Sequence, residues 1–559
     1  MKKTLGKTLA VLLVLALVFC SVCISVSAAD KSVYFAVTTD IHAECNGSAS
    51  LEHNFPENEL YFHAGGSGNL YDETPGLLKS FLAKAAAQNV DFVLVSGDLT
   101  RSGTPEEHAY VSSVLEAFTA ETGIKVYVLP GNHDYFHTTP EEFKEYYNNV
   151  SYANALVVDS ETGSYTADLP DDYRLIAVDS TEPGDDGDGL TDRLFGWIDE
   201  QVQAARADGK EIIYSMHHPL LEHLYLGKIL MSDFIVRNYE DVAEKFCNWG
   251  IQYVFTGHEH GNDVAKFVGK NGNTVYDVLT TSLSSYPLEY RTVTYSKSGV
   301  TLEMNSIDEC DFSSLKDGYT QAQLDLMAAD YNAYAYGYFR YSIEEKILKY
   351  TSPDFIKGKL KAETGLLAGE IDSLMTFVND ALKMPLYDDG SGELSIEALA
   401  AKKGVAIPES EYKSLVDLAT ALVALHYYGD ENLPSSEAVE GELFVKGLNT
   451  GLEYILANVE GHIADEILAF TSANAGAESD ALNRWFSAAG SEDSYEVAEK
   501  VLYPLLDKYT YDNAPADRDV TLPALGETEV KESGIASFFK KFLEIILNIL
   551  DMVFTGLIK

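Results

Sequence analysis

The chain has 559 residues, of which 87 are acidic and 40 are Lys or Arg, giving a formal net charge of −47. This length exceeds what a single hydrophobic core usually supports, so we expect two or more domains. The negative charge argues against a nucleic-acid polymer as a partner, because phosphate contacts require clustered Lys and Arg.

Residues 1–29 have the pattern of an export signal. Three Lys residues precede an apolar run, and small residues precede Asp30. We therefore expect this segment to be removed and the protein to be exported, either extracellular or associated with the cell surface. An uncleaved anchor is the alternative, because the apolar run is nearly long enough to span a bilayer.

Cleavage of this segment would remove three positive charges and lower the net charge to −50. Cys45, Cys247 and Cys310 would be the remaining cysteines. An odd and sparse set of cysteines argues against a disulfide framework in an exported protein.

Residues 30–308 predict an α/β domain, because short apolar runs rich in β-branched and aromatic residues alternate with helical patterns. The predicted strands are 32–37, 90–96, 124–129, 173–178, 211–216 and 251–256, and helices are expected at 74–89 and 104–123. After residue 274, three further segments predict antiparallel strands. These segments are 274–282, 290–296 and 299–306.

Residues 309–511 predict an all-α domain of unknown function. Leu415, Leu418 and Leu422 recur at spacings of three and four, which is typical of one face of a helix. A Pro-containing acidic stretch, residues 512–534, predicts a linker.

Residues 535–559 predict an amphipathic C-terminal helix with a narrow polar stripe. Charges within this segment disfavour a span across a bilayer. Two interpretations stay open. The helix lies in a membrane interface or drives self-association, or it docks on the preceding domain.

Polar side chains follow five of the predicted strands, where each strand ends. These side chains are Asp40, His42, Asp98, Asn132, His133, Asp134, His217, His258 and His260. In an extended segment residues i and i+2 point the same way, so Asp40 and His42 are expected to reach one ion. This mixture of nitrogen and oxygen ligands suits two transition-metal ions and contains too few carboxylates for calcium.

These blocks resemble the calcineurin-like metallophosphoesterase superfamily, whose motifs Asp-x-His, Gly-Asp, Gly-Asn-His-Asp/Glu, His and Gly-His-x-His occur here in order. They stand at Asp40–His42, Gly97-Asp98, Gly131–Asp134, His217 and Gly257–His260. The surrounding sequence is most similar to the bacterial branch that contains cyclic-nucleotide phosphodiesterases. The resemblance covers residues 32–300 and implies a four-layer α/β/β/α sandwich, which the all-α domain follows.

The resemblance implies a centre of two metal ions, and manganese, iron, zinc and cobalt all accept such ligands. The family pattern gives one ion to Asp40, His42 and His260, the other to Asn132, His217 and His258, and places Asp98 between them. A hydroxide bridging the two ions is the expected nucleophile.

Four further residues have expected roles near the metals. The resemblance places His133 beside them, to stabilise the transition state or protonate the leaving oxygen, with Asp134 orienting its imidazole. Arg101 is a candidate phosphate contact, with a surface ion pair as the alternative. His223 is a candidate for the lining of the substrate pocket.

These features predict an exported, metal-dependent phosphoric ester hydrolase, a phosphodiesterase or a phosphatase, whose partner is a phosphate-ester substrate. The alternative is a surface binding protein with a catalytically silent metallophosphoesterase-like domain. In that case the helical half would recognise the partner.

Overall fold

The computed structural model describes residues 31–44, 68–182, 187–223, 234–310, 319, 321–352, 368–429, 431, 434–463, 484–510 and 515–526. The predicted export signal and the predicted C-terminal helix at residues 535–559 lie outside these described residues.

Two mixed β-sheets form the centre of the N-terminal half. The six-stranded sheet has the order β13-β12-β11-β1-β2-β3, and the seven-stranded sheet has the order β4-β5-β6-β7-β8-β10-β9. The strands are β1 Ser32–Thr38, β2 Phe92–Ser96, β3 Lys125–Leu129, β4 Val157–Val158, β5 Tyr165–Asp168, β6 Tyr173–Val178, β7 Glu211–Met216, β8 Tyr253–Thr256, β9 Asp263–Val268, β10 Thr274–Leu279, β11 Glu289–Ser296, β12 Gly299–Ser306 and β13 Val520–Leu522.

Parallel strands lie at the heart of both sheets. Strands β1, β2 and β3 run parallel, as do β6, β7, β8 and β10. Every residue of β2 and β6 is buried, which explains their continuous apolar sequence. The prediction of antiparallel pairing holds for β11 and β12, whereas β10 pairs parallel with β8 and antiparallel with β9.

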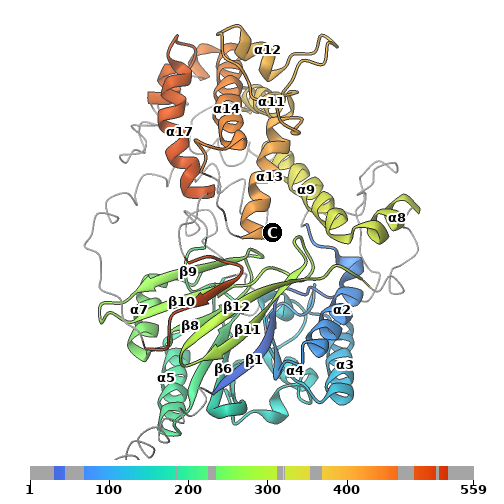
Figure 1. Cartoon of the computed structure of the whole chain (residues 1–559), viewed down its shortest axis with the longest axis vertical. Helices are drawn as coiled ribbons and strands as arrows, with labels where there is room; N and C mark the ends of the chain where they lie inside the picture. Colours follow the sequence, from blue (N-terminus) through green and yellow to red (C-terminus); the bar gives the residue numbers. More distant parts are fainter. Residues whose placement is uncertain are drawn as a thin grey trace, which may run out of the picture.

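Helices cover the outer faces of the two sheets (Figure 1). Helices α2 Thr74–Ala87, α3 Pro105–Thr122 and α4 Pro140–Tyr146 lie on the side of the six-stranded sheet, and α5 Asp192–Ala207 and α7 Tyr239–Trp249 lie on the other. The sheets pack face to face, with the rings of Phe35 in β1 and Phe255 in β8 5.5 Å apart. The predicted four-layer α/β/β/α sandwich is therefore confirmed.

Helices make up the regular structure in the described parts of residues 309–511. They are α8 Gln321–Ala329, α9 Tyr331–Tyr350, α11 Ala368–Lys383, α12 Ile396–Ala401, α13 Leu415–Tyr428, α14 Val439–Asn458 and α17 Ser494–Thr510. Leu415, Leu418 and Leu422 are buried on α13, as their spacing predicts. No helix among the described residues is long and apolar enough to cross a membrane.

The interpretation of residues 512–534 as a linker is wrong for its described part. Val520–Leu522 forms β13, which pairs antiparallel with β12 and completes the six-stranded sheet. A three-residue strand close to Pro523 gives too short an alternation to be recognised in the sequence. The chain therefore returns from the helical half to the sandwich.

Candidate metal centre

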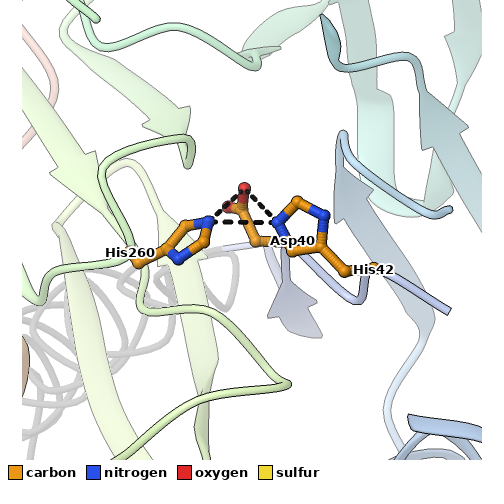
Figure 2. Close-up of side chains that lie close together, drawn as sticks. All are labelled: Asp40, His42 and His260. Atoms are coloured by element: carbon orange, nitrogen blue, oxygen red, sulfur yellow. Dashed lines mark hydrogen bonds and ion pairs between the residues drawn. The ribbon is translucent and has the colours of Figure 1, made fainter. Parts of the chain in front are cut away.

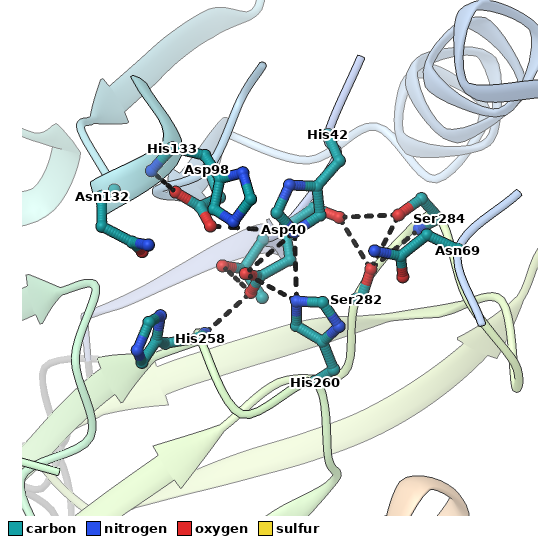
Figure 3. A network of polar contacts seen from close by, with 12 residues as sticks. Asp40, His42, Asn69, Asp98, Asn132, His133, His258, His260, Ser282 and Ser284 are labelled. Atoms are coloured by element: carbon teal, nitrogen blue, oxygen red, sulfur yellow. Dashed lines mark hydrogen bonds and ion pairs between the residues drawn. The ribbon is translucent and has the colours of Figure 1, made fainter. Parts of the chain in front are cut away.

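The candidate ligands gather at the carboxyl ends of strands from both sheets. Asp40 and His42 follow β1, Asp98 follows β2, Asn132 follows β3, His217 follows β7, and His258 and His260 follow β8. Because the two sheets face each other, these loops meet at one edge of the sandwich. Figure 3 shows the side chains converging from the two sheets.

Asp40, His42 and His260 form the first group of ligands (Figure 2). Nε2 of His42 lies 3.1 Å from Nε2 of His260. Oδ1 of Asp40 lies 3.2 Å from Nε2 of His260 and 3.7 Å from Nε2 of His42. Three ligand atoms from two sheets thus surround one point.

Asp98, His217 and His258 form the second group, and Asn132 adjoins it. Nε2 of His217 lies 3.1 Å from Nδ1 of His258, 3.4 Å from Oδ2 of Asp98 and 3.3 Å from Oδ1 of Asn132. The same Oδ2 of Asp98 lies 3.7 Å from Nε2 of His42 in the first group. Asp98 therefore stands between the two groups.

The residues fit a divalent metal centre. Metal–nitrogen bonds measure about 2.1 Å, and two such bonds at right angles place their nitrogens about 3.0 Å apart, close to the spacing seen here. Burial, with a contribution from the neighbouring His133, lowers the pKa of His42 to about 3, so its nitrogen carries a lone pair. Oδ1 of Asp40 is buried without a hydrogen-bond partner. A cation would satisfy these facing lone pairs.

Neighbouring histidines lower the pKa of both carboxylates of the centre and so favour their ionised form. Burial opposes their ionisation, but His217 and His133 hold the pKa of Asp98 well below its usual range. Burial also opposes the protonation of His217, yet Asp98 and Asp40 raise its pKa to about 9. Metal binding at His217 therefore releases a proton.

Five of the seven candidate ligands have a positive φ angle, which is rare for residues other than glycine. The values are 50° for Asp40, 47° for His42, 50° for Asp98, 74° for His258 and 61° for His260. The expectation that Asp40 and His42 share a direction because their segment is extended is therefore wrong. β1 ends at Thr38, and a left-handed turn brings the two side chains together.

Glycines allow the ligand loops to approach one another closely. A Cβ on Gly131 would lie 2.1 Å from Oδ1 of Asp98, and one on Gly257 would lie 2.0 Å from Oγ1 of Thr39. Both distances are far below van der Waals contact. The glycines of the motifs are thus required by close packing rather than by chemistry.

The structure places His133 beside the centre, as expected. One ring nitrogen lies within 4.8 Å of ligand atoms of His42 and Asp98, and the backbone N–H donates to Oδ1 of Asp98 over 2.9 Å. Its Nδ1 donates to the carbonyl of Arg101 over 2.6 Å. Nε2 is therefore the nitrogen that faces the centre (Figure 3).

Asp134 does not orient the imidazole of His133, so that expectation is corrected. Its carboxylate accepts from the N–H groups of Leu99, Thr100 and Gly131 and from the hydroxyl of Thr100. Burial, and then the charge of Asp98, raises the pKa of Asp134 to about 7. Asp134 joins the loop after β2 to the loop after β3.

Arg101 and His223 make contacts other than substrate contacts. The Arg101 guanidinium pairs with the buried Glu44 and lies 3.9 Å above the centre of the Tyr71 ring, so this ion pair is not the surface pair expected as the alternative. A contact of Arg101 with phosphate stays a prediction. Nδ1 of His223 lies 2.6 Å from Asp263 and Nε2 lies 3.0 Å from Asp277. Both ring nitrogens thus face buried carboxylates, and His223 is not assigned to the substrate pocket.

Sequence reasoning missed the residues that hold the backbone of Asp40. The hydroxyls of Ser282 and Ser284 donate to the Asp40 carbonyl over 2.7 and 3.2 Å (Figure 3). Thr39 donates to the Asp40 carboxylate over 2.7 Å. The cluster of Ser and Thr after β10 was the signal that could have indicated them.

The model of the family described as calcineurin-like phosphoesterase matches residues 33–262, a range that includes every candidate ligand. Residues 33–262 therefore form a calcineurin-like phosphoesterase domain. The motif resemblance in the sequence is thus confirmed.

Two curated relatives illustrate what this chain is similar to. A "Probable cyclic nucleotide phosphodiesterase" from Rhodococcus erythropolis is 24% identical over 220 residues, which are 39% of this chain and 65% of that protein. A "Probable glycerophosphodiester phosphodiesterase GpdQ" from Arcobacter nitrofigilis is 28% identical over 167 residues, 28% of this chain and 55% of that protein. Each alignment spans less than two thirds of the relative.

Among solved structures, a dimetal phosphatase from Danio rerio aligns with a TM-score of 0.38 and 12% identity. The alignment covers 50% of this chain and 98% of the phosphatase chain. A purple acid phosphatase from yellow lupin aligns with a TM-score of 0.32 and 13% identity. The alignment covers 50% of this chain and 52% of the lupin chain.

Proposed function

We propose that this protein is a metal-dependent phosphoric ester hydrolase. The observation that carries the proposal is the convergence of four imidazoles, two carboxylates and Asn132 at one edge of a calcineurin-like phosphoesterase domain, beside His133. The family match supplies the reaction class, and the complete ligand set argues against a degenerate, silent member.

A bound divalent centre would supply Lewis acidity, neutralising phosphate charge and lowering the pKa of a water. The chain's own residues supply the rest. Asp40, Asp98 and the histidines hold the centre, and the carbonyl of Arg101 fixes the ring of His133. Nε2 of His133 is then the atom that holds a proton for the leaving oxygen and releases it.

Two ions are the number that the geometry supports. The two ligand groups share Asp98, whose Oδ2 lies 3.4 Å from His217 and 3.7 Å from His42. In this arrangement one carboxylate serves both positions.

We favour a phosphodiester as the substrate class, because the relatives from Rhodococcus erythropolis and Arcobacter nitrofigilis are described as phosphodiesterases. We further propose that the protein acts outside the cytoplasm, since residues 1–29 have the pattern of an export signal. An exported enzyme would meet diesters of nucleotides, lipid head groups or wall polymers, with monoesters as the second class.

The decisive experiment compares initial rates on bis(p-nitrophenyl) phosphate and p-nitrophenyl phosphate, with manganese or zinc added. Faster diester hydrolysis supports a phosphodiesterase, and faster monoester hydrolysis indicates a phosphatase. Asp98→Ala should abolish either rate while circular dichroism shows an unchanged fold. Metal-loaded wild-type protein that is inactive on both substrates would favour the silent binding protein.

A further inference from the structure

The C-terminal end of α13 lies against the loop between β8 and β9, which carries His258 and His260. Figure 1 shows α13 descending from the helical half toward the sheets. A Cβ on Gly261 would lie 2.7 Å from Nε2 of His426, closer than atoms can pack. The helix end and the ligand loop are therefore in direct contact.

Asn262 connects this loop to the helix by hydrogen bonds. Its backbone N–H donates to the carbonyl of His426 over 3.3 Å, and its side-chain amide donates to the carbonyls of Tyr427 and Tyr428, each over 3.4 Å. Its Oδ1 accepts from the N–H of Thr281 over 3.1 Å. The last carbonyls of a helix have no partners within the helix, so Asn262 completes the end of α13.

Arg518 fastens the same helix end to the six-stranded sheet. Its two terminal nitrogens donate to the carboxylate of Glu289 in β11 over 2.8 and 2.7 Å, a bidentate pair. One of them also donates to the carbonyl of Tyr428 over 2.6 Å, and the guanidinium lies 3.7 Å from the centre of the Tyr428 ring. The end of α13 is thus held between Asn262 and Arg518.

A second loop of the centre also touches the helical half. The loop between β10 and β11 holds the carbonyl of Asp40 through Ser282. In the same loop, the ring of Tyr286 lies 4.9 Å from that of Tyr336 and 5.7 Å from that of Phe339, both in α9. Two loops that form the centre therefore rest on two helices of the C-terminal half.

We propose that the helical half positions the ligand loops, with Asn262 of the β8–β9 loop and Arg518, just before β13, as the positioning residues that join α13 to the sandwich; this inference rests on the metal centre of the proposed function. His258 and His260 have positive φ angles, a strained conformation for residues other than glycine, so the loop needs outside contacts to keep it. Asn262 follows His260 by two residues and supplies such contacts. The helical half is then part of the catalytic unit.

Two substitutions and one matched control test this proposal in the full-length protein. Asn262→Asp keeps an acceptor for Thr281 but sets an oxygen against the carbonyls of α13. Arg518→Ala removes the fastening to Glu289. The control is Lys403→Ala, because Lys403, which follows α12, donates to the carbonyls of Gly490 and Ser491 over 2.9 and 3.0 Å, contacts that lie within the helical half.

Two measurements are made on each protein. Equilibrium dialysis gives the dissociation constant for Mn²⁺, and hydrogen–deuterium exchange in chelator gives the protection of residues 257–264. We expect Asn262→Asp and Arg518→Ala to weaken Mn²⁺ binding about 10-fold or more, as loss of residues that orient metal ligands does, and to speed exchange in this segment. Lys403→Ala should change neither quantity.

Unchanged Mn²⁺ affinity in the folded Asn262→Asp and Arg518→Ala proteins would overturn the proposal, and so would an equal loss in Lys403→Ala. Should Arg518→Ala fail to fold, Asn262→Asp decides the question. Wild-type protein that binds no Mn²⁺ would overturn the metal centre and this inference together. Normal wild-type binding with unaffected variants would overturn this inference alone.

Discussion

Nδ1 of His133 donates to the backbone carbonyl of Arg101 over 2.6 Å, and this single contact fixes the ring beside Asp98 and His42. The contact joins the loop after β2 to the loop after β3, so the sandwich itself sets the direction of Nε2. His133 held in this way has a role different from that of the metal ligands.

The first prediction concerns His133→Gln. A glutamine cannot hold and release a proton, so we expect kcat to fall by about 10²- to 10⁴-fold, the usual contribution of general acid–base catalysis. Mn²⁺ affinity should stay within about threefold of wild type. Steady-state kinetics and equilibrium dialysis check both quantities, and a kcat close to wild type would show that another group supplies the proton.

The second prediction concerns Gly131→Ala. Its added Cβ would lie 2.1 Å from Oδ1 of Asp98, so the carboxylate must move and Mn²⁺ binding should weaken at least about 10-fold. Gly196→Ala in α5 is the control, because no atom lies within 4 Å of its added Cβ and Ala stabilises a helix by about 0.5–1 kcal/mol relative to Gly. Wild-type affinity in Gly131→Ala would contradict the close packing described here.

The sequence predicted the buried strands and the ligands because both have local signals. Continuous apolar runs such as that of β2 identify strands, and residues at strand ends identify the edge where the centre forms. Contacts between distant residues have no such signal. The pair of Arg101 and Glu44 spans 57 residues, and the return of Val520–Leu522 to the sheet depends on a free edge of β12.

The third prediction concerns metal and stability. A ligand that binds only the folded state stabilises that state by about 2.7 kcal/mol when its free concentration is 100 times its dissociation constant. Mn²⁺ should therefore raise the unfolding temperature of wild-type protein, and chelator should reverse the effect. Asp98→Asn should show a much smaller rise, since it replaces the carboxylate between the two ligand groups. Calorimetry measures the unfolding temperatures. An equal rise in wild type and in Asp98→Asn would mean that the metal binds elsewhere.

The fourth prediction concerns His108, which is fully buried in α3 between the hydroxyl of Tyr147 and the carbonyl of Asp134. Burial, opposed by the hydrogen bond to Asp134, lowers its pKa to about 4, against about 6.5 in the unfolded chain. The unfolded state therefore binds more protons between these values, and stability falls as pH drops from about 6.5 to 4, by at most about 3 kcal/mol.

His108→Gln should flatten this part of the stability profile, measured by urea unfolding in chelator between pH 7 and pH 4. Substitution of the exposed His137 by Gln is the control, because that ring is outside the core. A wild-type slope in His108→Gln would show that other groups cause the acid sensitivity.

The fifth prediction concerns His223, which lies between Asp263 and Asp277 with its side chain fully buried. Burial opposes its charge, but Asp277 and Asp263 raise the pKa of His223 well above its usual range. Because the folded-state pKa exceeds the unfolded one, this stabilisation is complete below about pH 6.5 and is lost as pH rises through the folded value. His223→Gln should leave two buried carboxylates without their cation and cost about 3–5 kcal/mol at neutral pH.

The triple variant His223→Gln, Asp263→Asn, Asp277→Asn separates this charge effect from a packing effect. With the carboxylates neutral, no buried charge is left unpaired, so most of the lost unfolding free energy should return. Urea unfolding of the single and triple variants measures the difference. An equal loss in both proteins would mean that the shape of the imidazole, rather than its charge, supports the loop beyond β7, and the alkaline loss of stability would then need another source.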